Sequence, residues 1–298
     1  MSTTDGEGWP PGLPLTPPDA LQRAQERWGS EHVLFEFPDQ GSVLTVGDLR
    51  TAAARWSAAL VHCGVAAGDR VAVCLPGHPL WPVLQVACAQ VGAAIAGINV
   101  KYRRWEVERF LAVVRPRLVV AATEWDEDSC IGSVVDLCRR DGHELLVVDE
   151  PMAGARFADD VLAEARPPRT EPAAGTDIGL VQFTSGSTGA PKAVAHTHAQ
   201  VMLSAHRIAE LAAYDETDVL FSALPFYHVG GSVCTGPVAL LSGATTVVPR
   251  RFSASGSVRT MVDRGCTATQ GHAAMFTMQI DRARADGVID RLRLRKGW

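Results

Sequence analysis

The chain has 298 residues with a formal net charge of −5, of which 47% are hydrophobic and 20% charged. This composition fits a packed globular protein and excludes the strongly basic surface of a nucleic-acid-binding domain. The seven cysteines are scattered and no pair has C-x-x-C spacing, so neither a zinc site nor a disulfide framework is indicated. We expect buried thiols in a reducing compartment, and hence a cytoplasmic protein.

The N-terminal segment is rich in proline and has no basic residue before Arg23. It lacks the positive start and apolar core of a signal peptide, so we expect a flexible tail over residues 1–20 and one domain over residues 21–298. Residues 71–100 contain no Asp, Glu, Lys or Arg, which raises the question of a membrane span. Prolines and polar residues interrupt the stretch, so a buried strand, a covered helix and a second buried strand are the better interpretation.

The pattern of apolar residues predicts helices alternating with short strands. A helix over 47–63 is bounded by a capping box, Thr45-x-x-Asp48, and by Gly64 as its stop. Residues 151–176, with four prolines, are expected to form a long connection. The alternation indicates an α/β fold with parallel sheets flanked by helices. We expect strands over 70–75, 94–98, 118–121, 145–148, 178–183, 219–222, 244–248 and 266–270, and further helices over 80–91, 106–114, 198–213, 231–241 and 254–264.

The segment Thr184-Ser185-Gly186-Ser187-Thr188-Gly189-Ala190-Pro191-Lys192 has the composition of a phosphate cradle. Glycines let the backbone approach a ligand, while hydroxyls, exposed N–H groups and a lysine can bind phosphate oxygens. It is not the common NTPase loop, because Ala190-Pro191 separates Gly189 from Lys192 and Ala193 stands where that loop needs Ser or Thr. An ordinary Ser- and Gly-rich surface loop is the alternative.

The same segment resembles the signature loop of the adenylate-forming (AMP-binding) superfamily, which includes acyl-CoA synthetases. Residues 44–49 with 68–73, then 93–99, and the segment Leu224 to Gly231 resemble further blocks of that family in the same order. The similarity runs from about residue 20 to the end. It implies a layered N-terminal AMP-binding domain that uses ATP, Mg²⁺ and coenzyme A.

The resemblance also assigns roles to residues. Thr184, Ser185, Gly186, Ser187, Thr188 and Gly189 would hold the pyrophosphate part of ATP, with Thr184 also near Mg²⁺. Lys192 would add charge or brace the loop, although a structural salt bridge is an alternative. His228 would line the acyl pocket and orient the carboxylate, where a lone histidine in an apolar block is otherwise usually structural. The glycines and valines that follow suggest an apolar pocket floor.

The substrate class follows from an absent charge. Family members that activate amino acids carry an aspartate in the block at 225–228 to pair with the α-ammonium group, and this block contains no acid. We therefore expect a carboxylic acid without an α-amino group, and an acid–thiol ligase. The spacing His196-x-His198 could suggest a metal, but helix entry is the better interpretation. His272 is expected near the acyl pocket.

Members of this family are much longer than this chain, and their later motifs, Tyr-Gly-x-Thr-Glu and Thr-Gly-Asp, do not occur in residues 232–298. We therefore expect an N-terminal domain that is incomplete at its C-terminus, without the lid domain, and inactive alone unless a complementing C-terminal fragment is present. Its partners would be small molecules, with no nucleic acid and no transmembrane segment. The alternatives are a noncatalytic nucleotide- or acyl-binding module and a nonfunctional fragment.

Overall fold

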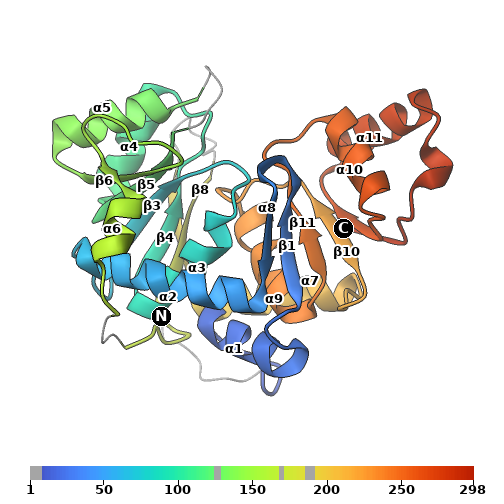
Figure 1. The fold of residues 1–298 in the computed structure, drawn as a ribbon, viewed down its shortest axis with the longest axis horizontal. Helices are drawn as coiled ribbons and strands as arrows, with labels where there is room; N and C mark the ends of the chain where they lie inside the picture. Colours follow the sequence, from blue (N-terminus) through green and yellow to red (C-terminus); the bar gives the residue numbers. More distant parts are fainter. Residues whose placement is uncertain (1–8, 124–128, 168–170, 185–191) are drawn as a thin grey trace.

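The computed structural model describes residues 9–123, 129–167, 171–184 and 192–298. Figure 1 shows two sheets side by side, with helix α3 (Leu80–Val91) between them. Most strand pairs in both sheets are parallel, and helices cover the sheets, which confirms the expected α/β class. The other long helices of the described part are α1 (Pro17–Trp28), α2 (Val46–His62), α4 (Arg104–Val114), α5 (Ile131–Asp141), α7 (His198–Leu211), α10 (Ala254–Asp263) and α11 (Ala273–Ala285).

The first sheet has seven strands in the order β7-β6-β5-β3-β4-β8-β9. All neighbours are parallel except β8 and β9, which pair antiparallel. Its strands are β3 (Arg70–Cys74), β4 (Ala94–Gly97), β5 (Leu118–Ala122), β6 (Glu144–Val148), β7 (Arg156–Phe157), β8 (Ile178–Thr184) and β9 (Lys192–Thr197).

The second sheet has six strands in the order β13-β12-β10-β11-β1-β2. It joins the two ends of the chain, because β1 pairs in parallel with β11, with Phe35 opposite Thr246. Its strands are β1 (Val33–Phe37), β2 (Ser42–Thr45), β10 (Val219–Ser222), β11 (Thr245–Val247), β12 (Ala268–Gln270) and β13 (Lys296–Gly297).

Helix α2 has the ends that its sequence predicts. Thr45 Oγ1 accepts a hydrogen bond from Asp48 N at 3.1 Å, and Thr45 N donates to Asp48 Oδ2 at 3.1 Å, which completes the capping box. At the other end Gly64 has φ 75° and donates to Val61 O, while Val65 N donates to Leu60 O. These two bonds form a Schellman motif, and its left-handed residue favours glycine.

The charge-free segment 71–100 forms β3, α3 and β4, as expected. All but one of the residues of α3 are buried, and the Trp81 side chain is fully buried between the sheets. Within the described ranges, no helix is long and apolar enough to cross a bilayer.

Several boundaries differ from expectation. Helix α1 begins at Pro17 and is capped by the buried Thr16, so residues 17–20 are its first turn and not part of a tail. The expected connection over 151–176 contains β7 and the helix α6 (Ala158–Glu164). The helix expected over 231–241 is two short helices, α8 (Val229–Ser232) and α9 (Gly236–Ser242). At the break between them, the Thr235 hydroxyl donates to Gly230 O.

The sequence also did not predict the strands β1, β2 and β9, or the helices α1, α5 and α11. Strands β2 and β9 are antiparallel to their partners, whereas only parallel strands were expected. Each follows its partner after a short connection, and a connection of that length can join only antiparallel neighbours.

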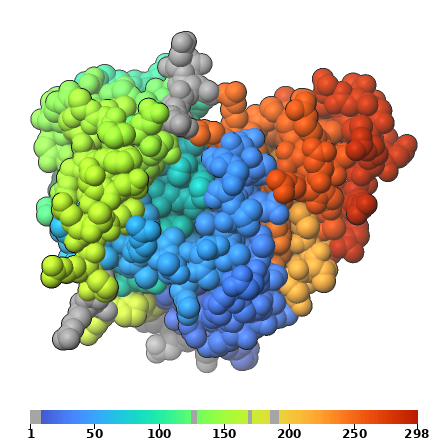
Figure 2. All heavy atoms as spheres, viewed as in Figure 1, coloured from blue at the N-terminus to red at the C-terminus, as the bar shows by residue number. Residues whose placement is uncertain are grey.

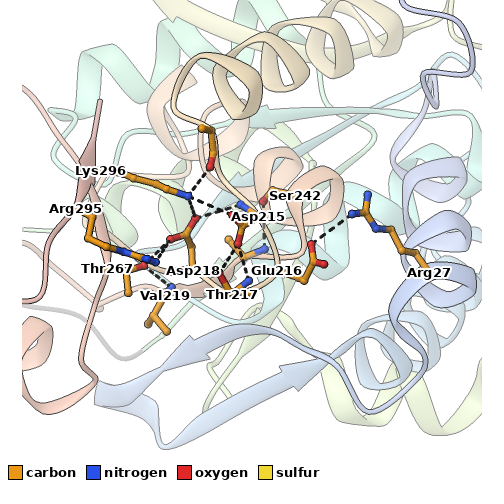
Figure 3. Close-up of polar contacts among 12 residues, drawn as sticks. Arg27, Asp215, Glu216, Thr217, Asp218, Val219, Ser242, Thr267, Arg295 and Lys296 are labelled. Atoms are coloured by element: carbon orange, nitrogen blue, oxygen red, sulfur yellow. Dashed lines mark hydrogen bonds and ion pairs between the residues drawn. The ribbon is translucent and has the colours of Figure 1, made fainter.

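The last strand of the second sheet is held by a buried carboxylate (Figure 3). The Asp218 side chain is fully buried and accepts hydrogen bonds from Thr267 Oγ1 at 2.7 Å, Arg295 Nη2 at 3.0 Å and Lys296 Nζ. Burial acts to raise the pKa of Asp218, but the hydrogen bonds from Lys296 and Thr267 outweigh it and lower the pKa. The ion pairs therefore fasten β13 to the start of β10.

Candidate functional site

A cleft of about 1040 Å³ lies where the two sheets meet. Its walls come from the segments that follow β3, β4, β10 and β11, so it is open to the carboxyl ends of parallel strands from both sheets. Ligands of open α/β sheets bind at this end. In Figure 2 the blue N-terminal part of the chain lies in front, between the green part and the orange and red part.

Hydrogen bonds join the segment that follows β3 to the segment that follows β11, and both segments line the cleft. Gly77 N donates to Arg250 O at 3.0 Å, and Gln40 Nε2 donates to Gly77 O at 2.6 Å. A side chain at Gly77 is excluded, because its Cβ would lie 2.1 Å from Pro249 O. Arg250 N in turn donates to Asp39 Oδ2 at 2.7 Å. No local pattern predicts these contacts, since they join segments far apart in the chain.

Strand β8 carries the start of the predicted phosphate loop to the same end of the sheet. Thr184 is its last residue, and Lys192, the first residue of β9, lies opposite Thr184 in the antiparallel register. Both side chains are exposed. The predicted site residues Ser185, Gly186, Ser187, Thr188 and Gly189 lie outside the described residues.

Alternation along β8 determines which way Thr184 faces. Val181 and Phe183 belong to one core, where the Phe183 ring lies 4.7 Å from the ring of Phe110. Leu180 belongs to the other core, between the sheets, and Gln182 and Thr184 share its face of the strand. Thr184 therefore faces the side on which the cleft and the His228 block lie.

His228 directly precedes helix α8 and is exposed. Its ring lies 5.0 Å from the Tyr227 ring at an interplanar angle of 57°. Partial desolvation by these surroundings lowers the pKa of His228 below its ordinary value of 6.5, although the residue is still accessible. The imidazole is therefore mainly neutral at neutral pH.

Tyr227 lines the cleft, and its backbone packs against Gly97, the last residue of β4. A Cβ at Gly97 would lie 2.6 Å from the Tyr227 Cα, so only glycine permits this approach of the two sheets. Burial raises the pKa of Tyr227 to about 12, with smaller contributions from Cys74 and Cys130, so the phenol is neutral.

A buried polar network connects β8 to the His228 block. Gln182 Nε2 donates to Ser232 Oγ at 2.7 Å, and Ser232 Oγ donates to His228 O at 2.9 Å. Gln85 Nε2, from α3, donates to Ser232 O at 2.8 Å. The sequence analysis did not single out Gln182 or Ser232. The signal for Gln182 is that its amide is a polar side chain within the apolar sequence of β8.

The other histidines considered in the sequence analysis are in the His196-x-His198 pair and at His272. Thr197 caps α7 and His198 begins it, with His198 N donating to Asp177 O at 3.0 Å, so the pair marks a helix entry. Burial lowers the pKa of His198 to about 4. In the described part of the chain, no group of three or more His, Cys, Asp and Glu side chains could hold a metal. His272 is exposed, precedes α11 and is not among the described cleft residues.

The residues expected on the pocket floor and the cysteines have mixed outcomes. Val233 and Val238 are buried, Val229 is 53% exposed, and none of the three is among the described residues that line the cleft. All seven cysteines are free and buried, as expected.

The structure is thus an α/β protein with a cleft at the carboxyl ends of two adjoining sheets. The chain belongs to the family described as AMP-binding enzyme, whose model matches residues 21–295. It is 28% identical to a sulfoacetate–CoA ligase from Cupriavidus necator over 83% of this chain and 47% of the relative. It is 24% identical to a mitochondrial medium-chain acyl-CoA ligase from Danio rerio over 86% of this chain and 46% of the relative.

The chain thus spans about half the length of the curated relatives it matches. Solved structures agree in fold. A fatty acyl-CoA synthetase from Mycobacterium tuberculosis has a TM-score of 0.78 at 21% identity, covering 94% of this chain and 54% of that one. The ATP-bound MatB from Rhodopseudomonas palustris has a TM-score of 0.76 at 22% identity, covering 93% and 54%.

Proposed function

We propose that this chain supplies the nucleotide- and acid-binding part of a carboxylate–CoA ligase. The reaction is the ATP-dependent conversion of a carboxylic acid without an α-amino group to acyl-AMP and then to acyl-CoA. The observation that carries the proposal is the hydrogen-bonded connection between β8, where the phosphate loop starts, and the His228 block beside the cleft. The CoA step is supported by the names of the relatives, which are CoA ligases.

The first step needs positioning and charge stabilisation. A carboxylate oxygen attacks the α-phosphorus of ATP, the bond to the β-phosphate breaks, and pyrophosphate leaves. In the proposal, Thr184, Lys192 and the intervening residues Ser185, Gly186, Ser187, Thr188 and Gly189 hold the β- and γ-phosphates. Hydroxyl and N–H donors aimed at these oxygens, with the Lys192 ammonium, offset the charge that develops on the leaving group.

Mg²⁺ would bind with the nucleotide at Thr184. This ion prefers oxygen ligands and usually keeps several waters together with substrate phosphates, so one exposed hydroxyl at a strand end fits it. When bound, Mg²⁺ neutralises charge on the phosphates. His228, mainly neutral, would donate a hydrogen bond to the acid and hold its carboxylate beside the cleft.

The charge distribution of the cleft supports the substrate class. The block at 225–228 contains no acid, and the carboxylate among the described cleft residues, Asp39, accepts a hydrogen bond from Arg250 N. Within the block at 225–228, an α-ammonium group would therefore meet no acidic partner, and burying an unpaired cation is costly.

Calorimetric titration with MgATP tests the nucleotide site. A hydrogen bond to a charged group is worth about 1.5–3 kcal/mol, so Thr184→Ala and Lys192→Ala should each weaken binding by about tenfold or more. Thr277→Ala, an exposed threonine on α11, is the matched control and should bind as the wild type does. If both site variants bind MgATP with the affinity of the wild type, the assignment of Thr184 and Lys192 to the nucleotide site is wrong.

Pyrophosphate exchange tests the chemistry and the substrate class. An aliphatic or aromatic acid should support exchange and leucine should not. Equal exchange with leucine would contradict the class, and binding of MgATP with no exchange would favour the noncatalytic alternative.

A further inference from the structure

Gln182 is a buried polar side chain in the apolar strand β8, and it reaches the helix that follows His228. It shares a face of the strand with Leu180 and Thr184, toward the space between the sheets. Its Nε2 atom lies 2.7 Å from Ser232 Oγ, and both side chains are buried. A buried polar group without a partner is destabilising, so this contact constrains both elements.

The chemistry of the groups fixes the direction of this hydrogen-bonded chain. The His228 carbonyl oxygen can only accept, so the Ser232 hydroxyl, 2.9 Å away, donates its single proton there. The Ser232 oxygen is then an acceptor, which requires the donor end of the Gln182 amide. Donation by Gln182 also polarises the Ser232 hydroxyl and strengthens its bond to His228.

Helix α8 has little support of its own, because it contains only four residues. Ser232 helps to hold it, because its N–H donates to His228 O at 3.0 Å and its carbonyl accepts from Gln85 Nε2 at 2.8 Å. Gly231 N, which donates to Pro225 O at 3.1 Å, holds it from the other side. Ser232 is therefore the residue that connects Gln182 of β8 to the carbonyl of His228.

We infer that Gln182 is a positioning residue that couples the nucleotide and acyl halves of the site. The inference rests on the proposed function. Thr184 lies two residues beyond Gln182 on the same face, so a phosphate at the end of β8 and a carboxylate at His228 are joined by two hydrogen bonds. A ligand on either side restrains the same chain of residues, so binding of one should strengthen binding of the other, reciprocally.

The test measures this coupling by calorimetry without turnover. The dissociation constants of octanoate and benzoate are determined with and without saturating α,β-methylene-ATP and Mg²⁺. In the wild type the analogue should tighten binding of the preferred acid by at least about fivefold, the lower end of ordinary coupling. Gln182→Met keeps the length of the side chain and removes the donor, so its coupling should fall below about twofold, while the analogue alone binds within about threefold of the wild type.

Gln279→Met is the matched control. Gln279 is another buried glutamine, on α11, and its Nε2 has no hydrogen-bond partner within the described structure. This variant should keep the coupling of the wild type, which separates positioning from the general effect of changing a buried amide.

Ser232→Ala removes the same connection from its other side and keeps the test decisive if Gln182→Met does not fold. It should lose the coupling, and the double variant should lose no more than either single variant. Full coupling in the folded variants, or independent binding of the two ligands to the wild type, would overturn the inference alone. A wild type that binds neither the analogue nor an acid would overturn the proposed function as well.

Discussion

The two sheets are built in different ways. The seven-stranded sheet comes from one continuous part of the chain, residues 70–197, and its centre is a stretch of thirty residues, 71–100, without a charge. The six-stranded sheet joins residues 33–45 to residues 219–297. Polar contacts hold these distant segments together, among them Thr245 Oγ1 to Val33 O at 3.0 Å and His32 Nε2 to Gly243 O at 2.7 Å.

The two sheets should therefore respond differently to pH. Apolar burial in the seven-stranded sheet changes little with pH, whereas the ion pairs of Asp218 in the six-stranded sheet depend on ionisation. The cleft lies where the two sheets meet, so its shape depends on both.

The largest effect is expected at the packing contact between the sheets. Trp81 of α3 stacks on Phe226, which follows β10, with ring centroids 5.9 Å apart, and both side chains are fully buried. Trp81→Ala should lower the free energy of unfolding by about 3–5 kcal/mol, measured by urea denaturation, because it leaves a large cavity. Trp105→Ala, at a residue that is 50% exposed, is the control and should change the free energy by less than about 0.5 kcal/mol. Equal losses of unfolding free energy in the two variants would show that the contact between Trp81 and Phe226 does not stabilise the fold more than an exposed tryptophan does.

A smaller, pH-dependent effect is expected at Asp218. Asp218→Asn should cost about 1.5–3 kcal/mol at neutral pH, because it removes charge-assisted hydrogen bonds with Thr267, Arg295 and Lys296. The pKa of Asp218 is lowered in the folded state, so its stabilisation is complete above the unfolded value of about 3.9 and is lost as the pH falls through the folded pKa.

The variant should therefore lose less stability than the wild type on acidification, which thermal unfolding between neutral and acidic pH measures. Asp263→Asn, at an exposed position, is the matched control. If the stability of Asp218→Asn falls with pH as steeply as that of the wild type, a group other than Asp218 controls the loss of stability at acidic pH.

The smallest effect is expected at the capping box, where β2 of one sheet leads into α2, which packs against α3. Thr45→Ala removes the hydroxyl that accepts from Asp48 N and should cost about 1 kcal/mol in the free energy of unfolding. Thr51→Ala, at an exposed position inside α2, lacks this role and should be neutral or slightly stabilising, since alanine favours helix. A cost at Thr51 as large as at Thr45 would refute the capping argument.

The sequence by itself determined the elements whose signals are local. The capping box and Gly64 lie within one helix length, and the charge-free stretch at 71–100, interrupted by prolines and polar residues, predicted the buried strand–helix–strand unit that the structure has. The composition of residues 184–192 and their resemblance to a family loop predicted a phosphate loop, and its role in ATP binding stays a prediction.

Only the tertiary structure decided the parts whose partners are distant in the chain. The short strands β1, β2 and β13 have weak patterns of their own and exist because another strand supplies their hydrogen bonds. Gln182 is a single amide in an apolar run until Ser232, fifty residues later, is brought to 2.7 Å from it. A hydrogen bond forms only when donor and acceptor lie about 3 Å apart. The sequence shows both groups, but only the fold shows that they lie within this distance.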